Sequence, residues 1–342
     1  MDIKKVLKVL CESCGVSGEE NETAKIAYSL LKEYSNDIII DDFNNVIVNI
    51  YDAGESAPKV LLDAHIDEIG MIVTYITDDG FLKVSNCGGI DKRLLLAQEV
   101  TIHGKEKIKG VIGAKPPHLT SEEDRKKVPD IESVVIDTGY TKKELEEIVS
   151  LGDRVTFCGD FAELKNDRVT AKSLDDRACI TAILYALKLL KGKDLKCSLS
   201  VLLSSQEEVG SAGATVASYK INPDYAIVVD VSFAYTADAE ERKCGKMGKG
   251  PMIGISPILD RKMSDEMIAI SKAKGYDYQI EVMGGKTGTN ADEITVTKNG
   301  VRAVTVSLPL KYMHTPVEMV EISDIKAVAR LIADYISEHN WQ

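Results

Sequence analysis

The sequence predicts an α/β fold in which helices flank a layered mixed sheet and a small β-rich barrel domain is inserted. Up to residue 67 and again after residue 165, apolar strand-like runs alternate with helix-like stretches, the pattern of a layered α/β sheet. Between residues 68 and 164, short β-type runs instead follow one another, with Gly and Pro between them. We therefore expect one α/β domain from residues 1–67 and 165–342, interrupted by a β-rich domain from residues 68–164.

The expected elements of the α/β part follow from local patterns. Helix is expected over most of the first 35 residues, where Ser17 and Glu20 have the spacing of a capping box. Apolar runs predict strands at residues 37–41, 45–51, 59–64, 198–205, 225–229, 278–282 and 303–308. Helices are expected at residues 176–190, 212–220, 262–274 and 322–339.

The inserted part contains five expected strands and one expected helix. The strands are residues 71–77, 81–84, 99–103, 108–112 and 133–136, and the helix lies around residues 142–149. Serial short strands of this kind are typical of a small barrel or an open sheet.

Composition excludes several classes of function. The 342 residues are 44% hydrophobic and 28% charged, which is ordinary for a folded globular protein. The 42 Lys and Arg against 54 Asp and Glu give a formal net charge of −12. Such an excess of acid disfavours a protein that binds nucleic acid by neutralising phosphates, and it disfavours attachment to a membrane through a basic face.

Targeting and redox features predict a cytoplasmic protein. The longest apolar stretch, residues 180–190, contains Lys188 and is too short to span a bilayer. The first ten residues lack an uninterrupted apolar core and a cleavage site, so no signal peptide is predicted. The seven cysteines are odd in number and scattered, which favours a reducing compartment over a disulfide scaffold.

Histidine or carboxylate side chains follow four of the predicted strands. In α/β sheets, ligands bind beyond the carboxyl ends of the strands, and His, Asp and Glu are the side chains that hold zinc-like ions. The residues concerned are His65 and Asp67 after the strand at 59–64, Glu207 and Glu208 after 198–205, Asp230 after 225–229, and His314 in the loop after 303–308.

Asp175 lies in a fifth segment, at the start of an expected helix. In the simplest interpretation it caps that helix, but its two carboxylate oxygens can also bridge two metal ions. Taken singly, each of these features is unremarkable; a Glu-Glu pair, for example, usually lies in a solvated turn. Their joint placement at strand ends favours a metal site.

The residue types match what two divalent ions need. Ions about 3.5–4 Å apart require about one His and one carboxylate each, together with a bridging carboxylate and a bridging water. His65, Asp175, Glu208, Asp230 and His314 supply that set. Asp67 lies two residues from His65 and points the same way, so it can accept the imidazole N–H and fix the tautomer. Glu207 is left over, and a free carboxylate beside a metal-bound water is suited to act as a general base.

Five ordered motifs are specific as a set: LLDAHIDEIG at 61–70, LDDR at 174–177, QEEVG at 206–210, VD at 229–230 and YMHTP at 312–316. Further matching segments are GVSG at 15–18, GAKPPH at 113–118 and GKGP at 248–251. Over essentially its whole length the chain resembles the metallopeptidase family of the tetrahedral (TET) aminopeptidases and glutamyl aminopeptidase. Some members of that family carry an endoglucanase label.

The resemblance implies a two-metal aminopeptidase with a di-zinc peptidase-like fold. One ion, Zn or Co, would be held by His65 with Glu208 or Asp230. The other would be held by His314 with the remaining carboxylate, and Asp175 would bridge the two.

The resemblance also assigns the remaining residues and domains. Asp67 would orient the metal-binding His65, and Glu207 would accept the proton. Residues 1–67 and 165–342 would form the catalytic domain, and residues 68–164 would form a dimerisation domain. Dimers would assemble further into a hollow tetrahedral dodecamer.

The predicted function is metal-dependent removal of N-terminal residues from short peptides. A two-metal deacylase or a carboxypeptidase stays open, because a ligand set does not fix the substrate. An endoglucanase is less favoured, since glycosidases use two carboxylates without a metal cluster, and 13 Tyr, 5 Phe and 1 Trp offer little surface for stacking sugars. A non-catalytic binding protein would be expected to have lost a ligand position, and none is lost here.

One segment departs from the family pattern. Many members have GGGTDA where this chain has GGKTGTNA at residues 284–291. The segment is expected to line the substrate pocket, so the preferred N-terminal residue is open among acidic, aliphatic and basic types. Arg261 and Lys262 could meet an acidic side chain, but a surface helix is the favoured interpretation for them.

Overall fold

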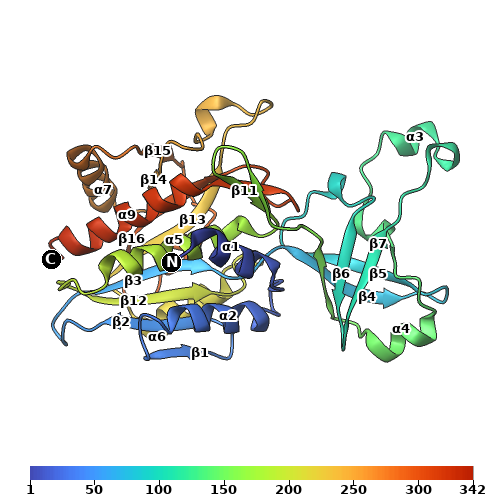
Figure 1. The fold of residues 1–342 in the computed structure, drawn as a ribbon, viewed down its shortest axis with the longest axis horizontal. Coiled ribbons are helices and arrows are strands. Elements are labelled where there is room, and N and C mark those ends of the chain that lie inside the picture. Colours follow the sequence, from blue (N-terminus) through green and yellow to red (C-terminus); the bar gives the residue numbers. More distant parts are fainter. Residues whose placement is uncertain (342) are drawn as a thin grey trace.

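The computed structural model describes residues 1–341, except for the side chains of residues 124 and 125. It has a large α/β body with a small barrel beside it (Figure 1). The mixed α/β architecture expected from the sequence is confirmed. Among the described residues, no helix is both long enough and apolar enough to cross a membrane.

The body is built on an eight-stranded sheet. In spatial order its strands are β1 (Ile38–Ile40), β2 (Val46–Tyr51), β12 (Ser198–Ser204), β3 (Lys59–His65), β13 (Tyr225–Phe233), β16 (Arg302–Leu310), β14 (Met252–Ile255) and β15 (Gln279–Val282). The four strands β12, β3, β13 and β16 run parallel to one another. Their carboxyl ends therefore meet at one edge of the sheet, where the site is found.

A smaller antiparallel sheet and the barrel complete the strands. The three-stranded sheet contains β10 (Ala162–Leu164), β11 (Arg168–Ala171) and β17 (Glu318–Glu321). The barrel closes in the order β4 (Gly70–Ile76), β5 (Phe81–Cys87), β8 (Ile136–Asp137), β7 (Lys107–Ile112), β6 (Glu99–His103) and β9 (Arg154–Phe157). It has its own apolar core, which includes Met71, Val84 and Ile102.

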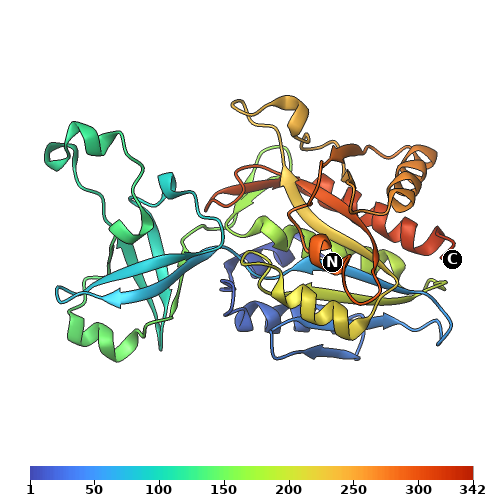
Figure 2. The same ribbon diagram turned by 180° about the vertical axis from the view of Figure 1, so that it is seen from behind.

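Helices cover both faces of the large sheet. The α-helices are α1 (Ile3–Glu12), α2 (Asn21–Leu31), α3 (Glu122–Arg125), α4 (Lys142–Ile148), α5 (Leu174–Leu190), α6 (Ala212–Ile221), α7 (Arg261–Lys274), α8 (Ala291–Ile294) and α9 (Ile322–Glu338). Helices α1, α5 and α9 pack together on one face (Figure 1). Helices α6 and α8 contact each other on the opposite face, where α6 is drawn in yellow (Figure 2).

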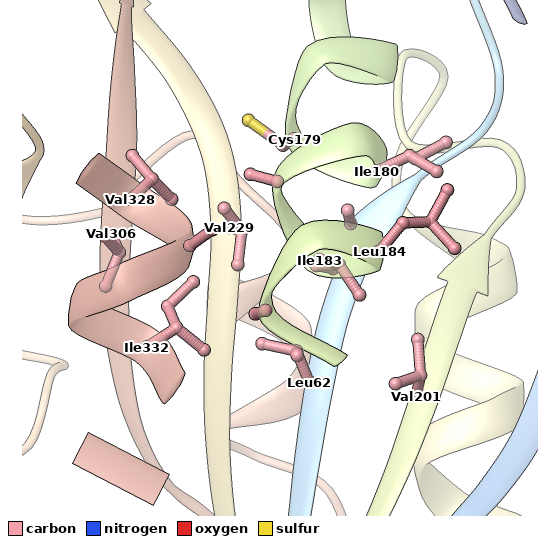
Figure 3. Close-up of a cluster of buried hydrophobic side chains, with 14 of the residues drawn as sticks. Leu62, Cys179, Ile180, Ile183, Leu184, Val201, Val229, Val306, Val328 and Ile332 are labelled. Atoms are coloured by element: carbon pink, nitrogen blue, oxygen red, sulfur yellow. The ribbon is translucent and has the colours of Figure 1, made fainter. Parts of the chain in front are cut away.

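The period-two pattern of the strands explains these two layers. Along β3, Val60 and Leu62 join the core under α5, whereas Leu61 joins the core under α6 and α8. Figure 3 shows Ile183 and Leu184 of α5 lying against the sheet side chains. Full burial of an aliphatic side chain contributes about 1.5–3 kcal/mol, so these contacts fix the strand ends firmly.

Three local predictions are wrong. The hydroxyl of Ser17 does not cap α2 but donates to Asp67 Oδ2 at 2.7 Å, because that buried carboxylate needs donors. Most of residues 133–136 lies outside the strand, since a 3₁₀ turn spans Ile131–Ser133 and β8 begins at Ile136. Strand β13 does not stop before Asp230 but pairs with β16 as far as Phe233.

Candidate active site

The predicted ligand residues come together at the carboxyl edge of the parallel strands. Asp175 lies at the start of α5, and the other ligands lie on or just after β3, β12, β13 and β16. The five predicted ligands and Glu207 line one cavity of about 720 Å³. The ligands are His65, Asp175, Glu208, Asp230 and His314. Asp67, the seventh predicted site residue, is fully buried behind His65.

The ligand atoms form two clusters that share Asp175. His65, Asp175 and Asp230 make one cluster, and Asp175, Glu208 and His314 make the other, with the atoms of each within 4.8 Å of one another. His65 therefore clusters with Asp230 and not with Glu208. The sequence had left both carboxylates open as partners of His65.

The two oxygens of Asp175 face different histidines. Oδ1 lies 3.1 Å from His65 Nε2, and Oδ2 lies 3.4 Å from His314 Nε2. His314 Nε2 also lies 3.3 Å from Glu208 Oε1. This arrangement suits a carboxylate that bridges two cations, with one oxygen directed toward each.

The electrostatics of the cavity favour bound cations. Burial raises the pKa of Asp230 well above its ordinary value, and burial also raises the pKa of Glu208. Burial by itself lowers the pKa of His314, but its contacts with Asp175 and Glu208 outweigh that effect and raise the pKa to about 11. A cavity in which buried carboxylates resist ionisation and an imidazole holds an extra proton is short of positive charge, so bound cations would stabilise it. The residues therefore fit a pair of divalent ions.

Asp67 anchors the site from behind. Its Oδ1 lies 3.3 Å from His65 Nδ1, on the side of the ring away from Asp175. The same carboxylate accepts the backbone N–H groups of Glu207 at 3.0 Å and Glu208 at 3.2 Å. Burial acts to raise the pKa of Asp67, but the adjacent His65 ring and the hydrogen bonds from Ser17 Oγ and the Glu207 backbone N–H hold it below the ordinary value. Asp67 thus lies against the imidazole and holds the Glu207–Glu208 turn through its two backbone N–H groups.

Two further carboxylates that the sequence did not single out support the ligands. Glu318 is buried, and its two oxygens accept the backbone N–H groups of Asp175 at 3.0 Å and His314 at 2.8 Å. Asp176 Oδ2 accepts the backbone N–H of His65 at 3.1 Å. Nothing in the sequence near Glu318 signals this role, because the contacts are made to main-chain groups. Its position four residues after His314 is the one available indication.

Glu207 faces the cavity without joining either ligand cluster. The preceding residue, Gln206, has a φ of 57°, a left-handed conformation that turns the chain sharply after β12. Burial raises the pKa of the Glu207 carboxyl to about 7, and the charges of Glu208 and Asp67 act in the same direction. In the metal-free protein, Glu207 can therefore gain and lose a proton near neutrality.

The segment 284–291 lines the cavity through Thr287, Gly288 and Thr289. Asn290 attaches it to the sheet, because its amide donates to Asp63 Oδ2 at 2.9 Å and to Ser204 Oγ at 2.7 Å. Both partners are buried at the ends of β3 and β12. The departure from the family pattern thus coincides with a wall of the pocket.

The model of the M42 glutamyl aminopeptidase family matches residues 44–331. The chain belongs to this family. A lysyl aminopeptidase from Pyrococcus furiosus is 32% identical over 98% of this chain and 96% of that protein. Among solved structures, an aminopeptidase from the archaeon Desulfurococcus kamchatkensis superposes with a TM-score of 0.92 at 32% identity, covering 98% of this chain and 95% of that one.

A second solved structure carries information on assembly. The TET1 peptidase of Pyrococcus horikoshii is 33% identical, with a TM-score of 0.85, and the match covers 99% of this chain and all of that one. That peptidase can assemble into a tetrahedron or a large octahedral shell. M42 peptidases are metallopeptidases, so membership makes this chain a metal-dependent peptide hydrolase of the aminopeptidase type. The predicted family and enzyme class are confirmed.

Proposed function

We propose that the chain removes N-terminal residues from short peptides with two divalent ions, a water shared between them and Glu207 as the general base. One observation carries this proposal: Asp175 belongs to both ligand clusters, and Glu207 lies free beside them in the same cavity. One ion would be held by His65 and Asp230, and the other by Glu208 and His314. Zinc and cobalt both suit this mixture of imidazole and carboxylate ligands.

The ions would polarise the scissile carbonyl and lower the pKa of the attacking water. Glu207 takes the proton from that water and returns it to the amine that leaves. Asp67 keeps Glu207 in place through its backbone N–H and keeps the His65 ring oriented. Burial of Glu207 serves this role, because a base with a pKa close to the working pH can both accept and release a proton.

Deacylation and carboxypeptidase action would use the same ions and the same base, so the ligand geometry alone does not separate them from aminopeptidase action. Membership of an aminopeptidase family favours removal of the N-terminal residue. In an endoglucanase, His65, His314 and the shared Asp175 would have no task.

We also propose that residues 68–164 form the dimerisation domain and that dimers assemble into a tetrahedral dodecamer. The barrel presents large apolar side chains to solvent, including Tyr75, Val111 and Leu151, which are 53%, 49% and 63% exposed. A dimer interface on the barrel would cover side chains of this kind. The assembly described for the Pyrococcus horikoshii relative supports the larger shell.

A substrate panel tests the proposed activity. Protein stripped with a chelator is assayed before and after addition of Zn²⁺, Co²⁺ or Mn²⁺. The substrates are aminoacyl-p-nitroanilides, N-acetyl amino acids and N-blocked dipeptides with a free C-terminus. We expect metal-restored cleavage of the anilides alone. Cleavage of only the N-acetyl or the N-blocked substrates would contradict the proposal and favour a deacylase or a carboxypeptidase.

A further inference from the structure

Glu281 gives the active-site cavity a carboxylate that the proposed metal chemistry does not use. It lies on the edge strand β15 and lines the cavity that contains His65 and Asp230. It belongs to neither ligand cluster. Glu281 is therefore available for a role other than metal binding.

Two serines hold the Glu281 carboxylate in place. Ser232 Oγ donates to Oε1, and Ser307 Oγ donates to Oε2 at 2.7 Å. Both serines are buried, with 8% and 2% of their surface exposed. A side chain fixed at both oxygens is already oriented for a ligand and loses little freedom on binding.

This anchoring places Glu281 beside the metal ligands. Ser307 is the register partner of Asp230 on the neighbouring strand, and adjacent strands lie about 4.8 Å apart. Ser232 follows Asp230 by two residues on β13, so both side chains point to the same side of the sheet. The distance from the Glu281 carboxylate to the place where a scissile bond would be held is thus within the reach of one long substrate side chain.

The Glu281 carboxylate has no protein cation to neutralise it. Among the side chains that the structure describes, no Lys, Arg or His nitrogen lies within 4.0 Å of a Glu281 carboxylate oxygen. Arg242 and Lys243 also line the cavity, but they are 79% and 71% exposed, and both pair with Glu240. The uncompensated charge inside the cavity is therefore negative.

The walls between Glu281 and the ligand clusters are partly apolar. Met252, Met283 and Met313 line the same cavity, and methionine adapts its shape to flexible chains. The aliphatic stem of a lysine or arginine can pack on such walls while its charged end reaches a carboxylate. A cavity of about 720 Å³ accommodates a side chain of that length.

We propose that Glu281 selects substrates whose N-terminal residue is lysine or arginine, by pairing with the charged end of that side chain. This inference rests on the proposed aminopeptidase function. Arg261 and Lys262 do not oppose it, because they lie on the surface helix α7 and pair there with Asp265 and Glu266. The other cation on a peptide substrate is its α-ammonium group, and the experiment below separates the two.

The test compares kcat/KM for Lys-, Arg-, Leu- and Glu-p-nitroanilide in metal-loaded wild type, Glu281→Gln and Glu281→Asp. Glu33→Gln serves as the matched control, since Glu33 is an exposed acid outside the cavity. We expect the wild type to prefer Lys and Arg. Glu281→Gln should lower kcat/KM for these two by about 10- to 100-fold and should change the Leu value by less than about threefold. Glu281→Asp should retain a preference for Lys over Leu, and Glu33→Gln should behave as wild type.

Other outcomes overturn the inference in distinguishable ways. An equal loss of kcat/KM for all four substrates in Glu281→Gln would indicate that the Glu281 carboxylate binds the α-ammonium group instead. A wild-type preference for Leu or Glu would contradict the selectivity while leaving the aminopeptidase function intact.

Binding supplies a readout that does not need turnover. Calorimetry is done in metal-loaded Glu207→Gln, which lacks the proposed base and so should not hydrolyse the amides. It should show tighter binding of lysinamide than of leucinamide, and adding Glu281→Gln should remove the difference. If no anilide is cleaved but this difference is present, the proposed function fails and the cation site stands. Equal binding of the two amides would overturn the cation site.

Discussion

Replacement of Glu207 by Gln separates catalysis from stability in one variant. The amide has nearly the same shape, and the backbone N–H of residue 207 still donates to Asp67, so the turn should keep its position. The variant loses only the ability to take a proton. General bases contribute about 10²–10⁴ in rate, so kcat should fall by that factor, or by about 2.7–5.5 kcal/mol of transition-state stabilisation.

The same substitution should stabilise the metal-free protein at alkaline pH. Burial raises the pKa of Glu207 from 4.5 to about 7, so its ionised form costs at most about 3 kcal/mol above pH 7. Gln removes this charge, and chelator-stripped Glu207→Gln should therefore unfold at a higher temperature than stripped wild type at pH 8. Bound metal should cancel most of this difference, because the cations already stabilise the carboxylate.

The assay pairs kcat on the best anilide substrate with metal content by mass spectrometry and thermal unfolding at pH 8. Glu208→Gln serves as the comparison, because it should lose metal as well as activity. Metal content close to wild type together with near-normal kcat in Glu207→Gln would refute the role of Glu207 as the base.

Three further predictions follow from the contacts of the site. Asp175→Ala removes the carboxylate shared by both clusters, so bound metal should fall at both positions and activity should be lost, as measured by mass spectrometry and anilide hydrolysis; retention of both ions would contradict the bridging role. Stripped wild type should lose stability as the pH rises from 5 to 8. The folded pKa of Glu207 is about 7 against an ordinary 4.5, and that of His314 is about 11 against an ordinary 6.5, so stability is lost progressively between the ordinary and the folded value of each group; a melting temperature that rises over this range would contradict this prediction. Asn290→Ala should destabilise the protein by about 1–3 kcal/mol in chemical denaturation, because buried Asp63 and Ser204 lose their donor, whereas exposed Asn21→Ala should be neutral.

Much of the α/β body could be predicted because its signals are local. Strand β3 has the apolar run that is typical of a buried strand, and α5 has the length and composition of a buried helix. Strand β14 escaped prediction because its four residues, Met252–Ile255, include a glycine and lie close to Gly250 and Pro251. Closure of the barrel was not fixed by pattern alone, since it depends on which strands pair across long loops.

The ligand residues could be predicted because parallel strands bring their carboxyl ends together. The sequence could not predict which carboxylate clusters with which histidine, because this depends on the register of the sheet. Asp230 lies opposite Ser307 and near His65 only in the folded sheet. Glu318 and Glu281 were missed for a related reason. Their partners are main-chain groups or serine hydroxyls, most of them far away in sequence, and no local motif indicates such contacts.

The requirement for two ions is tested most directly by titrating metal into the stripped protein while bound metal and anilide hydrolysis are measured on the same samples. We predict two ions per chain at saturation and full activity only when both positions are filled. Full activity with a single ion per chain, or activity that persists in the stripped protein, would contradict the two-metal site.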